Sequence, residues 1–399
     1  MNKRFLLSAL AVGSVWVGVT GLAQAAEPAT SSAELLRRVD QQQQQIDALK
    51  KQVEVANSAK VEEAGSTDSG PRDANSTDTW VGGYGELHHS NYQQKPADFD
   101  LHRFVLFFGH KFDDKLRFFS ELEVEHSIAG EGKKGEVELE QAYIEYQVHA
   151  DFNWKTGLFL IPVGIINETH EPPTFYGVER NSVEKDIVPA TWWEGGAGAT
   201  WNFADGFVVD IAATSGLNVA ADFNIRKGRQ KVSEAVGEDL AYTTRITYSG
   251  MAGLQLAASM QYQQDITQGL LPEGAPATLV EVHGIYQIGG FELRALYASW
   301  DIDSTAAELL GRDRQTGWYV EPSWQFSDSV GVFIRQSLWD TEAGSRVDSE
   351  RESLQMGVNY WLHPQVVLKA DYERQDGNKN DAGADFDDKG INVGLGYQF

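Results

Sequence analysis

The most constraining feature of this sequence is a period-two alternation of apolar and polar residues, which runs from Thr79 to the last residue. Near the end of the chain, for example, Leu368 and Ala370 alternate with Lys369 and Asp371. Successive side chains of a β-strand point to opposite faces, so each such segment predicts a strand with one apolar and one polar face. A strand of about ten residues is long enough to cross a bilayer at a tilt.

The alternating segments predict about sixteen strands. They lie near 79–88, 98–111, 114–126, 135–148, 150–161, 193–203, 205–215, 238–249, 251–264, 277–288, 290–301, 314–326, 328–340, 350–362, 365–375 and 388–399.

The connections between these strands alternate strictly between short and long. Short turns are predicted at Asp113-Asp114, Ala150-Asp151, Ala204-Asp205-Gly206, Ser249-Gly250, Gly289-Gly290, Ser327-Asp328 and His363-Pro364. Long polar loops are predicted near 89–97, 127–134, 162–192, 216–237, 265–276, 302–313, 341–349 and 376–387. A soluble sandwich has no reason for this alternation, whereas a membrane barrel has tight periplasmic turns and long external loops.

The predicted fold class is therefore all-β, an antiparallel transmembrane β-barrel of about sixteen strands spanning residues 79–399. Closure satisfies every backbone polar group in lipid, and an even number of strands returns both chain ends to the periplasmic side. Aromatic belts are expected at the strand ends. The Trp residues predicted there are Trp80, Trp154, Trp192, Trp193, Trp201, Trp300, Trp318, Trp324, Trp339 and Trp361.

The first 25 residues predict a secretory signal peptide. Lys3 and Arg4 precede a short apolar run, and Ala23-Gln24-Ala25 offers a small-residue cleavage site. No other segment has about 18 consecutive apolar residues, so no transmembrane helix is expected. We therefore expect an exported protein in the outer membrane.

Residues 26–58 predict a periplasmic helix. The apolar heptad positions between residues 31 and 58 are Leu35, Val39, Ile46, Leu49, Val53 and Ala56, with Gln42 as a polar member. A 3.5-residue repeat keeps one seam facing a partner helix, so a coiled coil in a small oligomer such as a trimer is expected. A lone solvated helix or spacer is the alternative. Residues 59–78 have little apolar content and predict a flexible linker.

Charge and cysteine content exclude several classes of partner and site. The chain carries 58 acidic and 33 basic residues, a net charge of −25, which disfavours binding to nucleic acid. It has no cysteine, which excludes disulfides and thiolate metal sites. No cofactor is expected.

The last strand ends in Tyr397-Gln398-Phe399 and is predicted to close the barrel against residues 79–88. Tyr397 and the terminal Phe399 look like the insertion signal that the outer-membrane barrel assembly machinery reads. The expected partners are that machinery and outer-membrane lipid.

The chain resembles the phosphate-selective porin O and P family over about 79–399. The stretches that carry the resemblance are GYGELH (83–88), DLHRFVLFFG (100–109), FSELEVE (119–125), EQAYI (140–144) and GIINETHEPPTFYGVERN (164–181). The resemblance implies a trimeric barrel of sixteen strands whose third long loop, about 162–192, folds inward and narrows the channel. It also implies phosphate selectivity, attributed in that family to an arginine ladder and to lysines at the constriction.

If the polar faces of the strands point inward, they supply the charges of the lumen. The basic candidates are Arg103, Arg117, Lys155, Arg245, Arg294, Arg335 and Lys369. The acidic candidates are Glu121, Glu123, Glu125, Glu145, Asp210, Glu281, Glu292, Glu321, Asp371 and Glu373. The third long loop adds Glu168, His170, Glu171, Glu179, Arg180, Glu184, Lys185 and Asp186.

This set is mixed in sign, and the loop has more acids than bases. Phosphate needs several Arg or Lys donors in one place to offset its dehydration. The sequence therefore favours passive diffusion of ions and small hydrophilic solutes, with a phosphate- or oxyanion-selective porin as the alternative. Basic residues on separate strands can still align at one height, which keeps that alternative open.

Two other classes are less favoured. A barrel enzyme needs a Ser–His or Asp–His arrangement, but the sequence has no Gly-x-Ser-x-Gly motif and His88, His89, His102, His110 and His126 are scattered along it. His170, between Glu168 and Glu171, has no second histidine at helical spacing, so no metal site and no catalytic residue is predicted. An adhesin or wall tether needs an external or wall-binding module, and the sequence predicts neither.

Overall fold

The computed structural model describes residues 78–128, 132, 135–377 and 387–399. The predicted signal peptide (1–25), helical segment (26–58) and linker (59–78) lie outside the described residues, except for Asp78. Within the described ranges, no helix is both long and apolar enough to cross a membrane.

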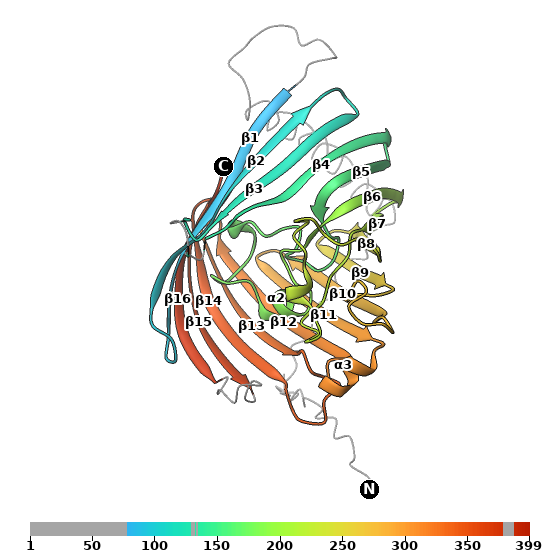
Figure 1. Ribbon diagram of the computed structural model, residues 1–399. Helices are drawn as coiled ribbons and strands as arrows, with labels where there is room; N and C mark the ends of the chain where they lie inside the picture. The colour runs from blue at the N-terminus through green and yellow to red at the C-terminus, as the bar shows by residue number, and fades with distance from the viewer. Residues whose placement is uncertain (1–77, 129–131, 133–134, 378–386) are drawn as a thin grey trace, which may run out of the picture. The chain divides into compact units, whose positions relative to one another are not determined.

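Sixteen strands form one closed antiparallel barrel (Figure 1), which confirms the predicted fold class. They are β1 Asp78–Tyr92, β2 Asp98–Lys111, β3 Leu116–Glu125, β4 Val137–His149, β5 Phe152–Leu160, β6 Trp193–Ala204, β7 Phe207–Thr214, β8 Ala241–Met251, β9 Leu254–Gln263, β10 Ala277–Ile288, β11 Phe291–Ile302, β12 Arg314–Ser327, β13 Val330–Asp340, β14 Arg351–His363, β15 Val366–Gly377 and β16 Asp388–Gln398. Each predicted strand overlaps the corresponding observed one.

Closure joins the last strand to the first, as predicted. β16 pairs with β1 from Tyr84↔Gln398 to Tyr92↔Gly390. The backbone N–H of Phe399 donates to the carbonyl of Gly83 at 2.8 Å, and the N–H of Gly83 donates to the carbonyl of Phe399 at 3.0 Å. The start of β1 and the end of β16 therefore lie at the same rim, which we call the turn rim because the short turns lie there. The opposite rim, with the long connections, is the loop rim.

One predicted turn is wrong by about three residues. The sequence placed it at Ser249-Gly250, but β8 continues to Met251, which pairs with Leu254 across a register shift that follows Tyr248. The chain reverses at Ala252-Gly253, where Gly253 has φ +75°. A side chain disfavours that left-handed conformation, so the second glycine rather than the first defines the turn.

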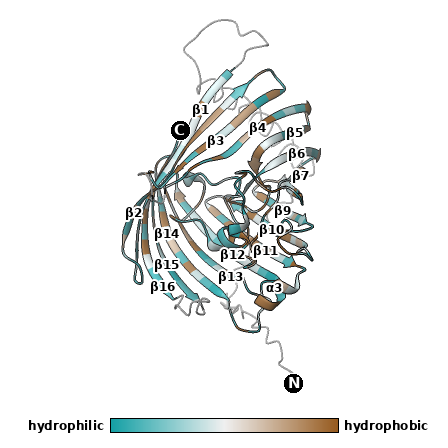
Figure 2. Cartoon of the chain, in the orientation of Figure 1, coloured by the Kyte–Doolittle hydropathy of each residue, from teal (hydrophilic) through white to brown (hydrophobic). Residues whose placement is uncertain are grey.

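Hydrophobic and hydrophilic residues alternate along the strands of the barrel wall, as the colours of Figure 2 show. On β10, Val280 and Val282 are 45% and 44% exposed on the outer face, whereas Glu281 between them is 0% exposed on the inner face. The same inward placement holds for Lys369, Asp371 and Glu373 on β15. An apolar outer surface around a polar interior is the pattern of a barrel that faces lipid.

The interior is not polar throughout. The inner wall of β10–β13 toward the loop rim carries buried apolar residues, among them Leu296 and Trp300, which share the inward face of β11 with Arg294. Two long connections fold inward and pack against it: residues 161–192, here the inner loop, and residues 215–240, here the second inner loop. Their buried apolar residues are Ile161, Val163, Ile165, Ile166, Val183, Ile187, Val188, Trp192, Leu217, Val219, Phe223 and Ile225.

This core corrects the expectation that Trp192, Trp300 and Trp339 belong to an interfacial belt. All three are buried inside the barrel. The indole N–H of Trp300 donates to the carbonyl of Ile187 in the inner loop at 2.8 Å. Burying large apolar side chains under two loops stabilises the packed interior more than exposing them at the rim would.

Glycines in the wall make room for the inner loop. A Cβ atom on Gly396 of β16 would lie 2.3 Å from Cβ of Pro172, and one on Gly331 of β13 would lie 2.2 Å from the hydroxyl of Tyr176. A Cβ on Gly317 of β12 would lie 2.9 Å from Cγ1 of Val183. The inner loop packs directly on the strand backbone at these places. The glycines of the inward face therefore leave the space that the loop side chains occupy.

Candidate functional site in the barrel interior

The inner loop leaves the wall after β5 and returns at β6. It contains the short helices η1 (Pro172–Thr174) and α2 (Ser182–Asp186), and α2 lies within the ring of strands in Figure 1. Asn181 caps α2 by accepting the N–H of Glu184 at 2.9 Å. An irregular loop leaves many carbonyls without partners, so the barrel wall must supply donors.

Side chains from four strands bind five consecutive carbonyls of the inner loop. The acceptors are the carbonyl oxygens of residues 173–177. The donors and distances are Trp361 to Pro173 at 3.3 Å, Arg294 to Thr174 at 3.2 Å, Asn359 to Phe175 at 3.1 Å, Arg335 to Tyr176 at 2.7 Å and Lys369 to Gly177 at 2.8 Å. Asp371 completes the row by accepting the N–H of Val178 at 2.7 Å.

Three predicted basic lumen residues therefore bind carbonyls of the loop. Arg335 also pairs with Glu321, its Nε lying 2.6 Å from Oε2, and donates to Gln355 at 2.6 Å. Arg294 pairs with Glu292, Nε to Oε1, at 2.6 Å. The ammonium of Lys369 lies 3.5 Å from the ring centroid of Phe175. These contacts make Arg294, Arg335 and Lys369 anchors of the inner loop.

Glu184 is a buried anchor at the other end of the loop. Its Oε2 accepts the N–H groups of Ile165 and Ile166 at 2.8 and 2.7 Å, and its Oε1 accepts the hydroxyl of Tyr319 at 2.7 Å. Burial raises the pKa of Glu184 above its ordinary value. Glu184 was predicted as one of the charges of the third long loop, and in the structure its carboxylate is buried in packed protein.

The acidic wall near β1–β4 holds the middle of the loop. Nε2 of His170 lies 3.4 Å from Oε1 of Glu121 and 3.6 Å from Oε2 of Glu140, with all three side chains buried. Arg103 lies between Glu86 and Glu123, at 2.8 and 3.4 Å. Arg103 therefore supplies a positive charge to two of these four buried carboxylates.

The remaining wall candidates are distributed around the barrel. Arg245 on β8 pairs with Asp210 on β7 at 2.8 Å and with Glu168 of the inner loop. Glu281 on β10 lies next to His283 at 2.7 Å. Lys155 on β5 lies 4.6 Å from the ring centroid of Phe159.

Arg117 and Glu145 pair with each other at the turn rim. They line a cavity of about 570 Å³ there, with Trp80, Phe119 and Tyr143. This cavity lies at the opposite end of the barrel from the long connections, and the predicted pair therefore marks a mouth of the interior.

Three adjoining cavities lie on the loop-rim side of the inner loop. Their volumes are about 510, 240 and 300 Å³. The first and second share Arg226, Arg229 and Lys231. The second and third share His88, His102, Glu179, Arg180 and Lys185. Glu125 lines the second, whereas Glu171 lines none of the three.

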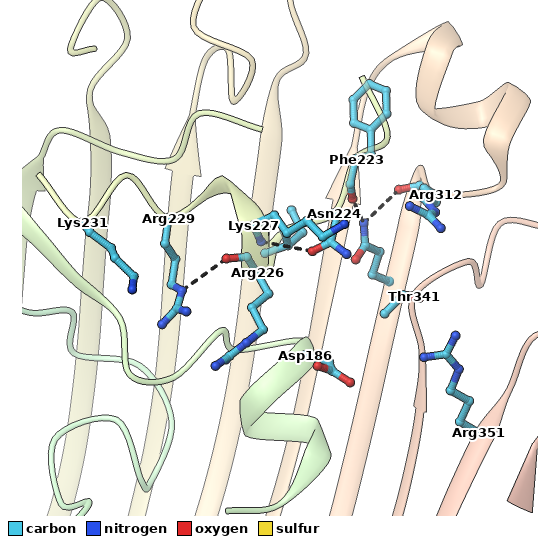
Figure 3. Close-up of a pocket in the computed structure, with 12 residues that line it drawn as sticks. Asp186, Phe223, Asn224, Arg226, Lys227, Arg229, Lys231, Arg312, Thr341 and Arg351 are labelled. Carbon is cyan, nitrogen blue, oxygen red and sulfur yellow. Dashed lines mark hydrogen bonds between the residues drawn. The ribbon is translucent and has the colours of Figure 1, made fainter. Parts of the chain in front are cut away.

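The largest of these cavities is strongly basic. Six of its twelve lining residues are arginine or lysine and one, Asp186, is acidic. The bases are Arg226, Lys227, Arg229, Lys231, Arg312 and Arg351. In Figure 3 the side chains of Arg226 and Arg229 point into the space beside the helix that ends at Asp186.

Arg180, Arg226 and Arg229 form what we call the arginine cluster. Arg226 donates to the carbonyls of Lys185 and Ala190 at 2.8 and 2.7 Å, and Arg229 to the carbonyls of Thr191 and Arg226. Arg180 donates from Nη1 to the Thr191 hydroxyl at 2.7 Å.

Among the described residues, the arginine cluster forms no ion pair with a carboxylate. Nε and Nη2 of Arg180 are buried and have no hydrogen-bond partner among the described residues. Burial and, next, the neighbouring Arg229 lower the pKa of Arg226 below its ordinary value. Within the described chain, no carboxylate lies within ion-pair distance of these three guanidinium groups, whereas Lys231 pairs with Glu136 at 3.0 Å.

Sequence reasoning missed the second inner loop. Arg180 was predicted as a charge of the third long loop, whereas residues 216–237 were predicted to be an ordinary polar loop. The available signal was the run Arg226-Lys-Gly-Arg-Gln-Lys231, four bases in six residues of an acidic chain. What the sequence does not indicate is that this loop folds inward.

A closed sixteen-stranded barrel, apolar outside and charged inside, defines an outer-membrane β-barrel protein. Solved structures share this fold. The outer membrane channel DcaP of Acinetobacter baumannii matches 83% of this chain and 100% of its own, with 11% identity and a TM-score of 0.57. OmpF of Salmonella typhi, in complex with daunomycin, matches 82% of this chain and 98% of its own, with 15% identity and a TM-score of 0.57.

Sequence comparisons give the family. Residues 194–382 match the model of the Gram-negative porins. An uncharacterized protein of Aquifex aeolicus is 32% identical over 337 residues, which span 74% of this chain and 75% of that protein. The match places residues 194–382 in the Gram-negative porin family, and together with the shared barrel fold it supports an outer-membrane channel for small solutes.

Proposed function

We propose that the solute path of this porin is narrowed by the inner loop and that the charge beside the narrowing favours small anions, including phosphate and other oxyanions. The observation that carries the proposal is the basic lining of the 510 Å³ cavity next to the arginine cluster. The carbonyl anchors at residues 173–177 support a fixed position of the loop across the interior.

The physical argument rests on where the positive charge lies. Guanidinium groups in a partly enclosed, low-dielectric space attract anions more strongly than they would in open water. Arg226 and Arg229 bind carbonyl oxygens rather than carboxylates, so among the described residues no ion pair neutralises their charge. The unpartnered Nε and Nη2 of Arg180 are donors of the type that bind oxyanions in a bidentate manner.

Passive diffusion without a charge preference is the second candidate. It is favoured by the adjoining 240 Å³ cavity, which is lined by Glu86, Glu125, Glu138, Glu140 and Glu179 as well as by bases. In that case the field of the acids cancels the field of the arginine cluster for a passing ion.

We further propose a homotrimer with its long loops outside the cell and its termini in the periplasm. OmpT of Vibrio cholerae, described in a trimer form, matches 81% of this chain and 99% of its own, with 11% identity and a TM-score of 0.55. The heptad of residues 31–58 and the strict alternation of turns and loops add support from the sequence.

The test is the reversal potential of the full-length protein in planar bilayers with asymmetric KCl. We expect chloride to be favoured over potassium in the wild type, and phosphate to reduce chloride current. The double variant R226Q/R229Q should lose most of the preference, whereas R226K/R229K keeps the charge and should retain it. R117Q, at the turn rim, is the control for a charge change elsewhere.

A cation preference in the wild type would overturn the anion proposal, as would an unchanged ratio in R226Q/R229Q. Equal permeabilities in the wild type would instead establish the second candidate. Crosslinking of the folded protein in the membrane, followed by gel analysis, tests the trimer independently.

A further inference from the structure

Three histidines that are far apart in the sequence meet on the inner wall beside the loop-rim cavities. His88 lies on β1, His102 on β2 and His126 immediately after β3. The rings of His88 and His102 stack with centroids 4.8 Å apart, and those of His102 and His126 meet edge to face at 5.4 Å. These three histidines, scattered along the sequence, are therefore neighbours in the fold.

Two irregularities of the backbone bring the rings together. On β2 a register shift pairs Arg103 with Glu86 and Leu101 with Leu87, which leaves His102 as the extra residue of a β-bulge. The bulge lets His102 and Arg103 both line the same cavity, although they are adjacent in sequence. His126 adopts φ +51°, a left-handed conformation that is costly for a residue with a side chain.

Carboxylates complete the cluster. Asp100 binds two of the rings, its oxygens lying 3.1 Å from Nδ1 of His102 and 2.8 Å from Nδ1 of His126. Glu179 of the inner loop binds Nδ1 of His88 at 2.8 Å, and Glu86 lies 3.1 Å from its Nε2.

Two groups of three donor atoms are each close enough to share one ion. One atom each from His88, His102 and Glu179, and likewise one each from Asp100, His102 and His126, all lie within 4.8 Å of one another. His102 belongs to both groups. Donors that bind one Zn²⁺ lie about 2 Å from it and so within about 4 Å of each other. Side-chain adjustments of less than about 1 Å therefore suffice.

The composition of the cluster selects the class of ion. Imidazole nitrogens with carboxylate oxygens suit Zn²⁺ and neighbouring transition metals, whereas Mg²⁺ and Ca²⁺ prefer oxygen ligands alone. A carboxylate that binds Nδ1 of a histidine holds the ring so that Nε2 is presented to a metal, and Asp100 has this relation to both His102 and His126.

We propose that His88, His102 and Glu179 bind one divalent transition-metal ion on the wall of the solute path, with Asp100 and His126 behind His102. His88, His102 and Asp100 belong to the barrel wall, whereas Glu179 belongs to the inner loop. The bound ion ties the loop to β1 and β2 and occupies space beside two of the cavities. It therefore lowers the conductance of the pore.

The binding part of the proposal does not depend on the anion preference. Metal binding is measured with the metal alone, in the absence of a transported solute. The conductance part rests on the proposed function only in placing these cavities on the solute path. Failure of the anion preference would leave both expectations unchanged.

The experiment uses the folded full-length protein in detergent, treated with a chelator and then titrated with Zn²⁺ by calorimetry. We expect one ion per chain for the wild type. H102A removes the ligand common to both groups and should weaken binding by about ten-fold or more. H110A is the matched control, because His110 lies on the turn-rim part of β2 and binds Thr79 at 2.7 Å. Folding of each variant is checked by heat-modifiable migration on gels.

A measurement on the unmutated protein guards against misfolded variants. Co²⁺ bound by imidazole and carboxylate ligands in place of Zn²⁺ should give visible absorption bands that added Zn²⁺ abolishes. Single-channel conductance of the wild type should fall when Zn²⁺ is added, and that of H102A should not.

Lack of Zn²⁺ binding by the wild type, or equal binding by H102A, would overturn the site. A stoichiometric site without a conductance decrease would overturn the tie between loop and wall.

Discussion

The hydroxyl of Tyr319 on β12 donates to Oε1 of Glu184 in the inner loop at 2.7 Å, while the other oxygen of Glu184 binds the N–H groups of Ile165 and Ile166. One buried carboxylate thus joins the beginning of the loop, its second helix and the barrel wall. The residue was predicted as a charge of the constriction, and the structure gives it the contacts of a structural tether.

Replacing Glu184 by Ala should loosen the inner loop. The N–H groups of Ile165 and Ile166 and the hydroxyl of Tyr319 lose their acceptor, at about 1–3 kcal/mol each, and the longer 3.5 Å bond from Asn181 is lost as well. We expect a larger and noisier single-channel conductance and a lower free energy of unfolding in urea. Y319F removes one of these bonds and should give a smaller change of the same sign. Wild-type conductance in E184A would show that the loop is held without this carboxylate.

The same carboxylate predicts a pH dependence of stability. Burial raises the pKa of Glu184 in the folded protein, so folding favours its protonated form. This stabilisation is fully present below the ordinary carboxyl pKa and is lost as the pH rises through the raised folded pKa. The free energy of unfolding of the wild type relative to E184Q should therefore increase as the pH falls from 8 to 4. A difference that is constant or decreases would contradict the assignment.

The wall glycines give a test of how the loop is seated. Gly396→Ala places a methyl group where Cβ of Pro172 lies 2.3 Å away, so η1 must move. Overpacking of this kind costs about 1–3 kcal/mol. Gly284→Ala is the matched control, because the nearest atom, at 3.1 Å, is the mobile Cδ2 of Leu256 on the same sheet. Urea midpoints should fall for G396A alone; equal midpoints would argue against a tight socket.

Arg335 and the arginine cluster should respond differently to loss of charge. Arg335 is buried in an ion pair with Glu321, so R335Q leaves a buried carboxylate without its partner and should cost about 3–5 kcal/mol. R226Q/R229Q should change the anion preference with a smaller effect on stability. Urea unfolding and reversal potentials, measured on both variants, separate the two roles. A stable R335Q channel with altered selectivity would reverse the assignment.

The backbone and the side chain of Phe399 allow barrel closure and assembly in cells to be tested separately. Its backbone bonds with Gly83, and its side chain is exposed on the outer face. F399A keeps the backbone bonds, so the purified chain should refold in detergent as the wild type does. If the ring is read by the assembly machinery, less folded F399A will reach the outer membrane. L362A removes another outward-facing side chain and serves as the control. Normal membrane levels of F399A would exclude a signal in the ring.

The strands were predictable because each one is a local pattern. Period-two alternation and turn residues specify strand position and face without reference to the rest of the chain. The shift of the turn from Ser249-Gly250 to Ala252-Gly253 shows where that information ends, because both dipeptides contain a glycine and the ladder with β9 decides between them.

The interior was predicted less completely because it depends on contacts between distant residues. The alternation along β13 predicts that the side chain of Arg335 points inward. Its bond to the carbonyl of Tyr176, however, depends on where the inner loop lies. Likewise, the alternation around Leu101 gives no sign of the bulge that turns His102 toward His88. Wall residues could be named from the sequence, whereas their partners could not.

The five anchored carbonyls at residues 173–177 have a consequence for how such a channel can diversify. A carbonyl oxygen is present whatever the side chain, so the barrel fixes the course of this segment through atoms that substitution leaves intact. The adjacent positions Glu179 and Arg180 line the cavities beyond the anchored stretch. Evolution or protein engineering can therefore exchange the side chains that line these cavities without redesigning the scaffold that positions them.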